Sequence, residues 1–178
     1  MSRALKIKYI VIHCTAGHSS ADKVQAYFLR SKALGGRGWK VGGYHRIIEK
    51  DGTVKNMYDF ETITNGVGGF NTSCLHISYV GGVDPDNVYK AKDTRTDAQN
   101  KAIIKCIVEA IMWLKANGKD ITKDLMVLGH YDFSDDKNKN GAIDPQERIK
   151  ECPSFDAKKQ YNGLFGASNS IQTLPKNR

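Results

Sequence analysis

The chain has 178 residues and a formal net charge of +8, with 40% hydrophobic and 26% charged residues. This length and composition predict one compact domain with a substantial core, and they exclude a membrane-spanning or largely disordered chain. The positive charge indicates attraction to polyanions, which include bacterial wall polymers, nucleic acid and anionic lipid, unless it serves solubility alone.

The start of the chain and its cysteines indicate where the protein works. Residues 1–6 lead directly into the β-branched run 7–12, which is too short and too strand-like for a signal sequence, so we expect a protein that is cytoplasmic as synthesised.

The basic residues are scattered and accompany no nucleic-acid-binding motif, so we expect neither nucleic acid as a partner nor membrane insertion. Four cysteines lie far apart with no Cys-x-x-Cys pair, which favours reduced thiols over disulfides: Cys14, Cys74, Cys106 and Cys152.

The first third of the chain predicts three strands and a helix. Residues 6–13 form a β-branched run that is typical of a buried strand, and this run ends in a histidine. Apolar residues at helical spacing then predict a helix over 20–34. A β-hairpin should follow, with strands over 42–49 and 53–58 around the turn at Asp51-Gly52.

The rest of the chain predicts two more strands and a long helix. A strand is expected over 75–80, and residues 125–129 predict a short last strand. Between them, Thr96 and Gln99 form a capping box that opens an amphipathic helix. We therefore expect a single α/β domain over residues 1–178, with a mixed central β-sheet and helices packed on it.

Three side chains of the types that zinc prefers stand at the ends of predicted elements. His13 and His130 each follow a predicted strand, and Cys152 follows a loop. Two imidazoles and a thiolate, with a fourth position left for water, form a catalytic zinc arrangement, whereas a structural site takes four protein ligands. Taken as isolated residues, such histidines are more often hydrogen-bonded structural residues, and such a cysteine is more often a small buried hydrophobe.

Five short phrases place these residues in a fixed order. They are Val11-Ile12-His13-Cys14-Thr15-Ala16, then Gly43-Tyr44-His45-Arg46-Ile47-Ile48 with Asp51-Gly52-Thr53-Val54, then Val80-Gly81-Gly82, then Gly129-His130, then Lys150-Glu151-Cys152-Pro153-Ser154-Phe155-Asp156. Together they cover about residues 6–160 and resemble the N-acetylmuramoyl-L-alanine amidase family. The chain most resembles the amidase-type bacteriophage lysozymes, which are relatives of the animal peptidoglycan-recognition proteins.

The resemblance implies a reaction and a site. It implies that His13, His130 and Cys152 hold Zn²⁺. It also implies that Tyr44 and Lys150 are the catalytic pair, which would stabilise the developing oxyanion and assist proton transfer to the leaving amine. The implied reaction is hydrolysis of the amide between N-acetylmuramic acid and L-alanine in bacterial peptidoglycan. Without the resemblance, Tyr44 would be a strand aromatic and Lys150 a surface lysine.

The resemblance also implies a setting for the protein. We expect a monomer that acts on the cell wall after release from the cytoplasm, as a phage lysin does, with a bacterial recycling or interbacterial enzyme as the alternative. A catalytically silent peptidoglycan-binding module of the same fold is the alternative. The presence of Cys152 favours the enzyme, because a protein that only binds needs no third zinc ligand.

The sequence departs from the family in two places, which are the loop that borders the substrate groove and an insertion between His130 and Lys150. Residues 65–71 lie where relatives commonly have a histidine-containing segment, and this loop has none. His45 should point to the opposite strand face from its neighbour Tyr44, which favours a structural role. The alternative is that His45 orients a metal ligand through a hydrogen bond. His18 and His76 match no catalytic position.

An insertion between the second and third proposed zinc ligands has a motif of its own. Residues 136–147 match a twelve-residue EF-hand loop, with glycine at position 6 and an apolar residue at position 8. We therefore predict a Ca²⁺ loop within the domain, with an ordinary polar turn as the alternative, and a peripheral C-terminal tail from about residue 164. The predicted calcium ligands are Asp136, Asn138, Asn140, the carbonyl of Ala142, Asp144 and Glu147.

Overall fold

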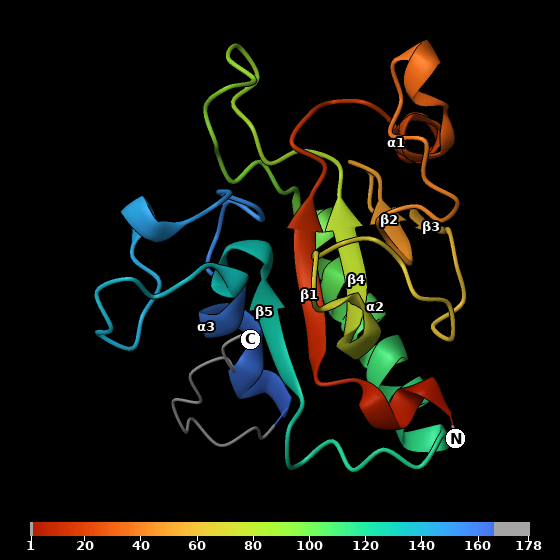
Figure 1. Ribbon diagram of the computed structural model, residues 1–178, viewed down its shortest axis with the longest axis vertical. Helices are drawn as coiled ribbons and strands as arrows, with labels where there is room; N and C mark the ends of the chain where they lie inside the picture. Colours follow the sequence, from red (N-terminus) through yellow and green to blue (C-terminus); the bar gives the residue numbers. More distant parts are fainter. Residues whose placement is uncertain (1, 166–178) are drawn as a thin grey trace.

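A computed structural model describes residues 2–165 and shows a five-stranded mixed β-sheet with helices packed on it (Figure 1). The strand order is β3-β2-β4-β1-β5. Strand β1 is parallel to both β4 and β5, β2 is parallel to β4, and β3 pairs antiparallel with β2. The strands are β1 (Tyr9–Cys14), β2 (Arg46–Ile48), β3 (Val54–Asn56), β4 (Cys74–Tyr79) and β5 (Met126–Gly129). The predicted fold class is confirmed.

Helices and short 3₁₀ turns connect the strands of the described chain. The α-helices are α1 (Ala21–Leu29), α2 (Asp97–Ala116) and α3 (Ala157–Tyr161). The 3₁₀ turns are η1 (Arg3–Lys6), η2 (Lys32–Leu34), η3 (Asn71–Ser73), η4 (His130–Phe133), η5 (Pro145–Glu147) and η6 (Asn162–Phe165). None of the described helices is long and apolar enough to span a membrane.

The long helix α2 covers one face of the sheet and forms the main core with it (Figure 1). Its predicted capping box is present, because the Thr96 hydroxyl accepts from Gln99 N and the Gln99 side chain accepts from Thr96 N. Each fully buried Ile or Leu side chain contributes about 1.5–3 kcal/mol, so burial of one apolar helix face is what holds α2 in place. Its buried residues are Gln99, Ala102, Ile103, Cys106, Ile107, Ala110, Ile111 and Leu114.

Strand alternation sorts the side chains of β1 and β4 between the two faces of the sheet. Ile12 and Ile77 belong to the core with α2. Val11 and Cys74 belong to a second cluster on the opposite face. Because successive strand residues point to opposite faces, His13 shares the face of Val11, away from α2.

Two element boundaries differ most from the sequence prediction. Helix α1 ends at Leu29 instead of continuing to Leu34, because Arg37 N and Trp39 N donate to the carbonyls of Tyr27 and Phe28 and fold the chain back along the helix. Strand β2 begins at residue 46, so the preceding residues lie outside the ladder. The predicted tail from about residue 164 lies almost entirely outside the described residues.

Candidate active site

Two histidines and a cysteine converge where the parallel strands β1 and β5 end. His13 lies on β1, and His130 follows β5 directly. The two strands are in register at Ile12 and Gly129, which brings the histidines side by side. His13 Nδ1 lies 3.2 Å from His130 Nδ1 and 3.7 Å from the Sγ of Cys152. All three ligand atoms lie within 4.8 Å of one another, and the described residues contain no other such group of three or more His, Cys, Asp or Glu.

The spacing of these atoms fits a zinc ion. Zn–N bonds of about 2.0–2.1 Å and a Zn–S bond of about 2.3 Å, at tetrahedral angles, place the nitrogens about 3.3 Å apart and a nitrogen and sulfur about 3.6 Å apart. The distances of 3.2 Å between the Nδ1 atoms of His13 and His130, and of 3.7 Å from His13 Nδ1 to Cys152 Sγ, agree with this geometry.

Burial sets the protonation of the cluster. It lowers the pKa of His130 to about 4 and holds the pKa of His13 well below its usual 6.5. Both imidazoles are therefore neutral near pH 7 and keep a lone pair for a metal. Burial also raises the pKa of the Cys152 thiol. A metal cation beside Cys152 would stabilise its thiolate, which is the form of cysteine that binds metals.

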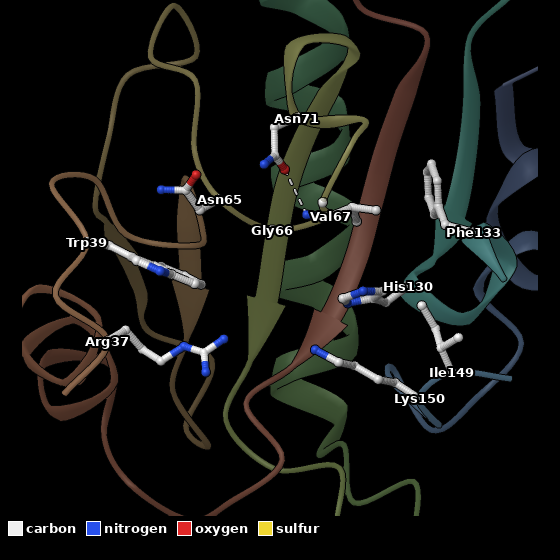
Figure 2. Close-up of a pocket in the computed structure, with 11 residues that line it drawn as sticks. Arg37, Trp39, Asn65, Gly66, Val67, Asn71, His130, Phe133, Ile149 and Lys150 are labelled. Carbon is white, nitrogen blue, oxygen red and sulfur yellow. Dashed lines mark hydrogen bonds between the residues drawn. The ribbon is translucent and has the colours of Figure 1, made fainter. Parts of the chain in front are cut away.

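The two residues expected to act as a catalytic pair lie beside this cluster. The ring of Tyr44 lies 5.0 Å from that of His13, centroid to centroid, and packs edge-on against Phe28. Burial raises the pKa of Tyr44, so its phenol stays protonated and can donate a hydrogen bond. Figure 2 shows Lys150 on the same side of the pocket as His130, with its ammonium pointing inward.

A pocket of about 440 Å³ opens next to the cluster. His130 and Lys150 lie on one side of it, and Arg37 and Trp39 lie on the opposite side (Figure 2). The Arg37 guanidinium lies over the Trp39 ring, 5.0 Å from its centroid, and that ring stacks on Phe28 of α1. The pocket therefore has a cationic group on each side, and His130 is the member of the histidine and cysteine cluster that lines it.

The other histidines take different places. His45 is buried, its Nε2 lies 3.0 Å from the carbonyl of Thr62, and its Nδ1 accepts from the backbone N–H of His76. These contacts tie His45 to the backbone on both sides of its ring, and it precedes β2. His18 is exposed in the loop after β1.

Sequence reasoning missed His76. Its Nδ1 lies 3.1 Å from Nε2 of His13, on the face of the sheet that looks away from α2. The available signal was positional, because His76 alternates with Leu75 and Ile77 on β4 and so must point to the same face as His13.

The predicted calcium loop is closed by its own hydrogen bonds. Glu147 is buried, and its carboxylate accepts from the backbone N–H groups of Lys137, Asn138 and Asp144. The carboxylate of Asp136 accepts from the N–H groups of Asn140 and Gly141. The structure gives no support to calcium here, because these oxygens bind backbone amides and, in the described chain, do not gather at metal-ligand spacing. The remaining predicted ligands are Asn138 and Asn140, whose amides donate to Asp144, and Ala142, whose N–H donates to Asn140.

The fold and the cluster define a class of protein. The structure of Drosophila PGRP-LB superposes with a TM-score of 0.61 at 17% identity, over 96% of this chain and 86% of that chain. The N-acetylmuramoyl-L-alanine amidase LysC from Clostridium intestinale superposes with a TM-score of 0.55 at 20% identity, over 92% of this chain and 87% of that chain. The shared architecture is thus that of amidases and peptidoglycan-recognition proteins.

Sequence comparison gives the family itself. The model of the N-acetylmuramoyl-L-alanine amidase family matches residues 3–153, and the chain belongs to this family. It is 29% identical to an endolysin of Klebsiella phage KP32 over 152 residues, which are 85% of this chain and 83% of that protein. It is 27% identical to the endolysin of Escherichia phage T7 over 125 residues, which are 70% of this chain and 67% of that protein.

Proposed function

We propose that the protein is a zinc-dependent amidase that hydrolyses the bond between N-acetylmuramic acid and L-alanine in bacterial peptidoglycan. The observation that carries this proposal is the convergence of His13, His130 and Cys152 beside a pocket, with His13 Nδ1 at distances from His130 and Cys152 that fit a tetrahedral zinc site. Membership of the amidase family and the endolysins among its relatives support the substrate.

The residues of the site have complementary roles in this reaction. His13, His130 and Cys152 would hold the zinc and leave its fourth position free. When bound, zinc supplies a Lewis acid that polarises the scissile carbonyl and makes water nucleophilic near pH 7. The protonated phenol of Tyr44 donates a hydrogen bond to the oxygen that becomes negative. The Lys150 ammonium stabilises the same charge or supplies a proton to the departing amine.

The surface of the molecule suits an acidic polymer. The formal net charge is +8, and Arg37 and Lys150 place positive groups on both sides of the pocket. Teichoic acids and peptide carboxylates of a bacterial wall are polyanionic, so electrostatic attraction would concentrate the enzyme on its substrate. We propose that the protein acts as a monomer on the wall after release from the cell that makes it.

A binding module without catalysis is the rival function. Peptidoglycan recognition proteins share the fold, and one similar structure is of tracheal cytotoxin bound to the recognition proteins LCa and LCx. A protein that only binds wall fragments does not need a thiol beside two neutral imidazoles, or a half-buried phenol next to them. The arrangement of Cys152 and Tyr44 therefore favours the enzyme.

Product analysis distinguishes these functions. Purified protein is incubated with peptidoglycan, and the soluble products are analysed by mass spectrometry. We expect new L-alanine amino termini and intact glycan strands. New reducing sugar ends would instead identify a glycosidase, and binding to walls without any release of peptides would identify the binding module.

A further inference from the structure

His76 is a buried side chain on β4 that contacts the proposed zinc site from behind. It is 0% exposed, and its Nδ1 lies 3.1 Å from Nε2 of His13. The other ring nitrogen of His13 faces His130 and Cys152. His13 is therefore held between the proposed ligands on one side and His76 on the other.

The chemistry of imidazole fixes the direction of the hydrogen bond. A neutral imidazole has one N–H and one lone pair, so a His13 that binds a metal through Nδ1 must carry its proton on Nε2. That N–H then donates to the lone pair of Nδ1 on His76. A ligand histidine is commonly oriented through its second nitrogen in this way, and such contacts raise its basicity.

The surroundings of His76 make a purely structural role a poor explanation. Its Nε2 is buried and has no hydrogen-bond partner among the residues that the structure describes. A buried polar atom without a partner costs about 1–3 kcal/mol, which an apolar side chain of similar size would avoid. Within residues 2–165, the one hydrogen bond that the ring makes is the bond to His13.

A glycine in the neighbouring loop makes room for this ring. A Cβ built on Gly66 would overlap Nδ1, Cγ and Cε1 of His76, so an alanine there would push the imidazole out of place. The backbone of Gly66 does not have a positive φ, and hence glycine is required by the contact and not by the turn. Gly68, two residues further along the loop, has no described heavy atom within 4 Å of the same built atom.

We propose that His76 is a positioning residue for zinc, which holds the His13 ring in the orientation and tautomer that present Nδ1 to the metal, and that Gly66 is small in order to admit it. This inference rests on the proposed zinc site. Loss of such a contact typically weakens metal affinity by about 10- to 100-fold.

Two substitutions of His76 separate orientation from space filling. Asn and Leu have nearly the same shape, but Asn keeps an acceptor oxygen near the position of Nδ1. Zinc affinity is measured by competition with a chromophoric chelator. We expect His76→Leu to weaken binding about 10- to 100-fold and His76→Asn to stay within a few-fold of the wild type. Equal weakening in both variants, or none in the Leu variant, would overturn the proposal.

A second pair of variants leaves the imidazole in the chain. Gly66→Ala should weaken zinc binding in the same direction as His76→Leu, because it displaces the ring, whereas the matched change Gly68→Ala should leave zinc affinity unaltered. Nitrogen-15 spectra of the zinc-free protein give a further readout, since the proton of His13 should reside on Nε2 in the wild type and redistribute in Gly66→Ala. An Nδ1–H tautomer in the wild type, or identical affinity in both glycine variants, would contradict the inference.

These results separate the inference from the proposed function. If the wild type binds no zinc, the zinc site and the role of His76 fail together. If the wild type binds one zinc and releases L-alanine termini while His76→Leu and Gly66→Ala bind zinc equally well, only the role of His76 fails.

Discussion

Tyr44 and the buried histidines illustrate how burial prepares single residues for chemistry. The interior raises the pKa of the Tyr44 phenol and lowers the pKa of His13 and His130, so that the site holds a hydrogen-bond donor and two neutral metal ligands near pH 7. Each shift has the same dominant cause, which is removal of the charged form from water. Burial therefore keeps each of these side chains in its neutral form, whereas a free imidazole near pH 7 exists as a mixture of neutral and charged forms.

Removal of the Tyr44 hydroxyl tests its role in the transition state. Tyr44→Phe should lower the rate of wall hydrolysis by about 10²–10³-fold, because one oxyanion donor is lost, while zinc content and melting temperature stay near those of the wild type. Lys150→Ala should behave similarly. Tyr89→Phe is the control, since Tyr89 is 96% exposed in the segment between β4 and α2 and does not line the pocket. Wild-type rates in both site variants would remove the pair from the mechanism.

His45 makes the stability of the protein depend on pH. Burial lowers its pKa to about 3 in the folded state, against 6.5 for an unperturbed histidine. Between these values the unfolded chain binds the proton and the folded chain does not, so stability is complete above pH 6.5 and falls as the pH drops. His45→Asn keeps an acceptor for His76 N and should reduce the slope of unfolding free energy by about 1.4 kcal/mol per pH unit between pH 6 and 4. Urea titrations with equal slopes for both proteins would show that His45 does not titrate in this way.

The sheet and its loops show which elements a sequence pattern can locate. Strands β1, β4 and β5, the hairpin of β2 and β3, and helix α2 follow local signals, namely β-branched runs, Asp51-Gly52 and a capping box. The end of α1 could not be predicted, because backbone hydrogen bonds from residues 37 and 39 decide it. Tyr44 lies just before β2, which begins at residue 46, although the backbone N–H of its neighbour His45 still donates to the carbonyl of His76 on β4.

The loop 136–147 depends on one buried carboxylate. Glu147 accepts from three backbone N–H groups, at residues 137, 138 and 144. Glu147→Gln replaces one accepting oxygen with an amide that donates, so we expect a loss of about 1–3 kcal/mol in unfolding free energy. Glu151→Gln, an exposed position nearby, is the control. Equal stability of the two variants in denaturant titrations would show that the carboxylate does not hold the loop.

Calcium binding in this loop stays a prediction from its EF-hand pattern. If the ion binds only the folded state, millimolar Ca²⁺ should raise the melting temperature, and Asp136→Ala should abolish the effect. The measurement is made with zinc held constant by a buffer. An unchanged melting curve of the wild type would reduce the segment to a polar insertion that its own hydrogen bonds close.

At the scale of the whole molecule, the site is a meeting of segments that lie far apart in the chain. The resemblance alone assigned His13, His130 and Cys152 as zinc ligands, and the parallel pairing of β1 with β5 brings the two histidines together. The contact between His76 and Gly66 could not be predicted, because it depends on how a loop packs against a strand over tertiary distance. Local patterns therefore locate elements, whereas the environment of the site depends on their packing.

Zinc content of matched cysteine variants tests the central claim most directly. The wild type, Cys152→Ser and Cys106→Ser are purified, and zinc per chain is measured together with wall hydrolysis. Cys106 is a buried thiol on α2, in the core and outside the cluster, so its variant controls for the loss of a sulfur. The account predicts one zinc per chain and full activity in the wild type and Cys106→Ser, and loss of both in Cys152→Ser. Full zinc and full activity in Cys152→Ser would contradict it.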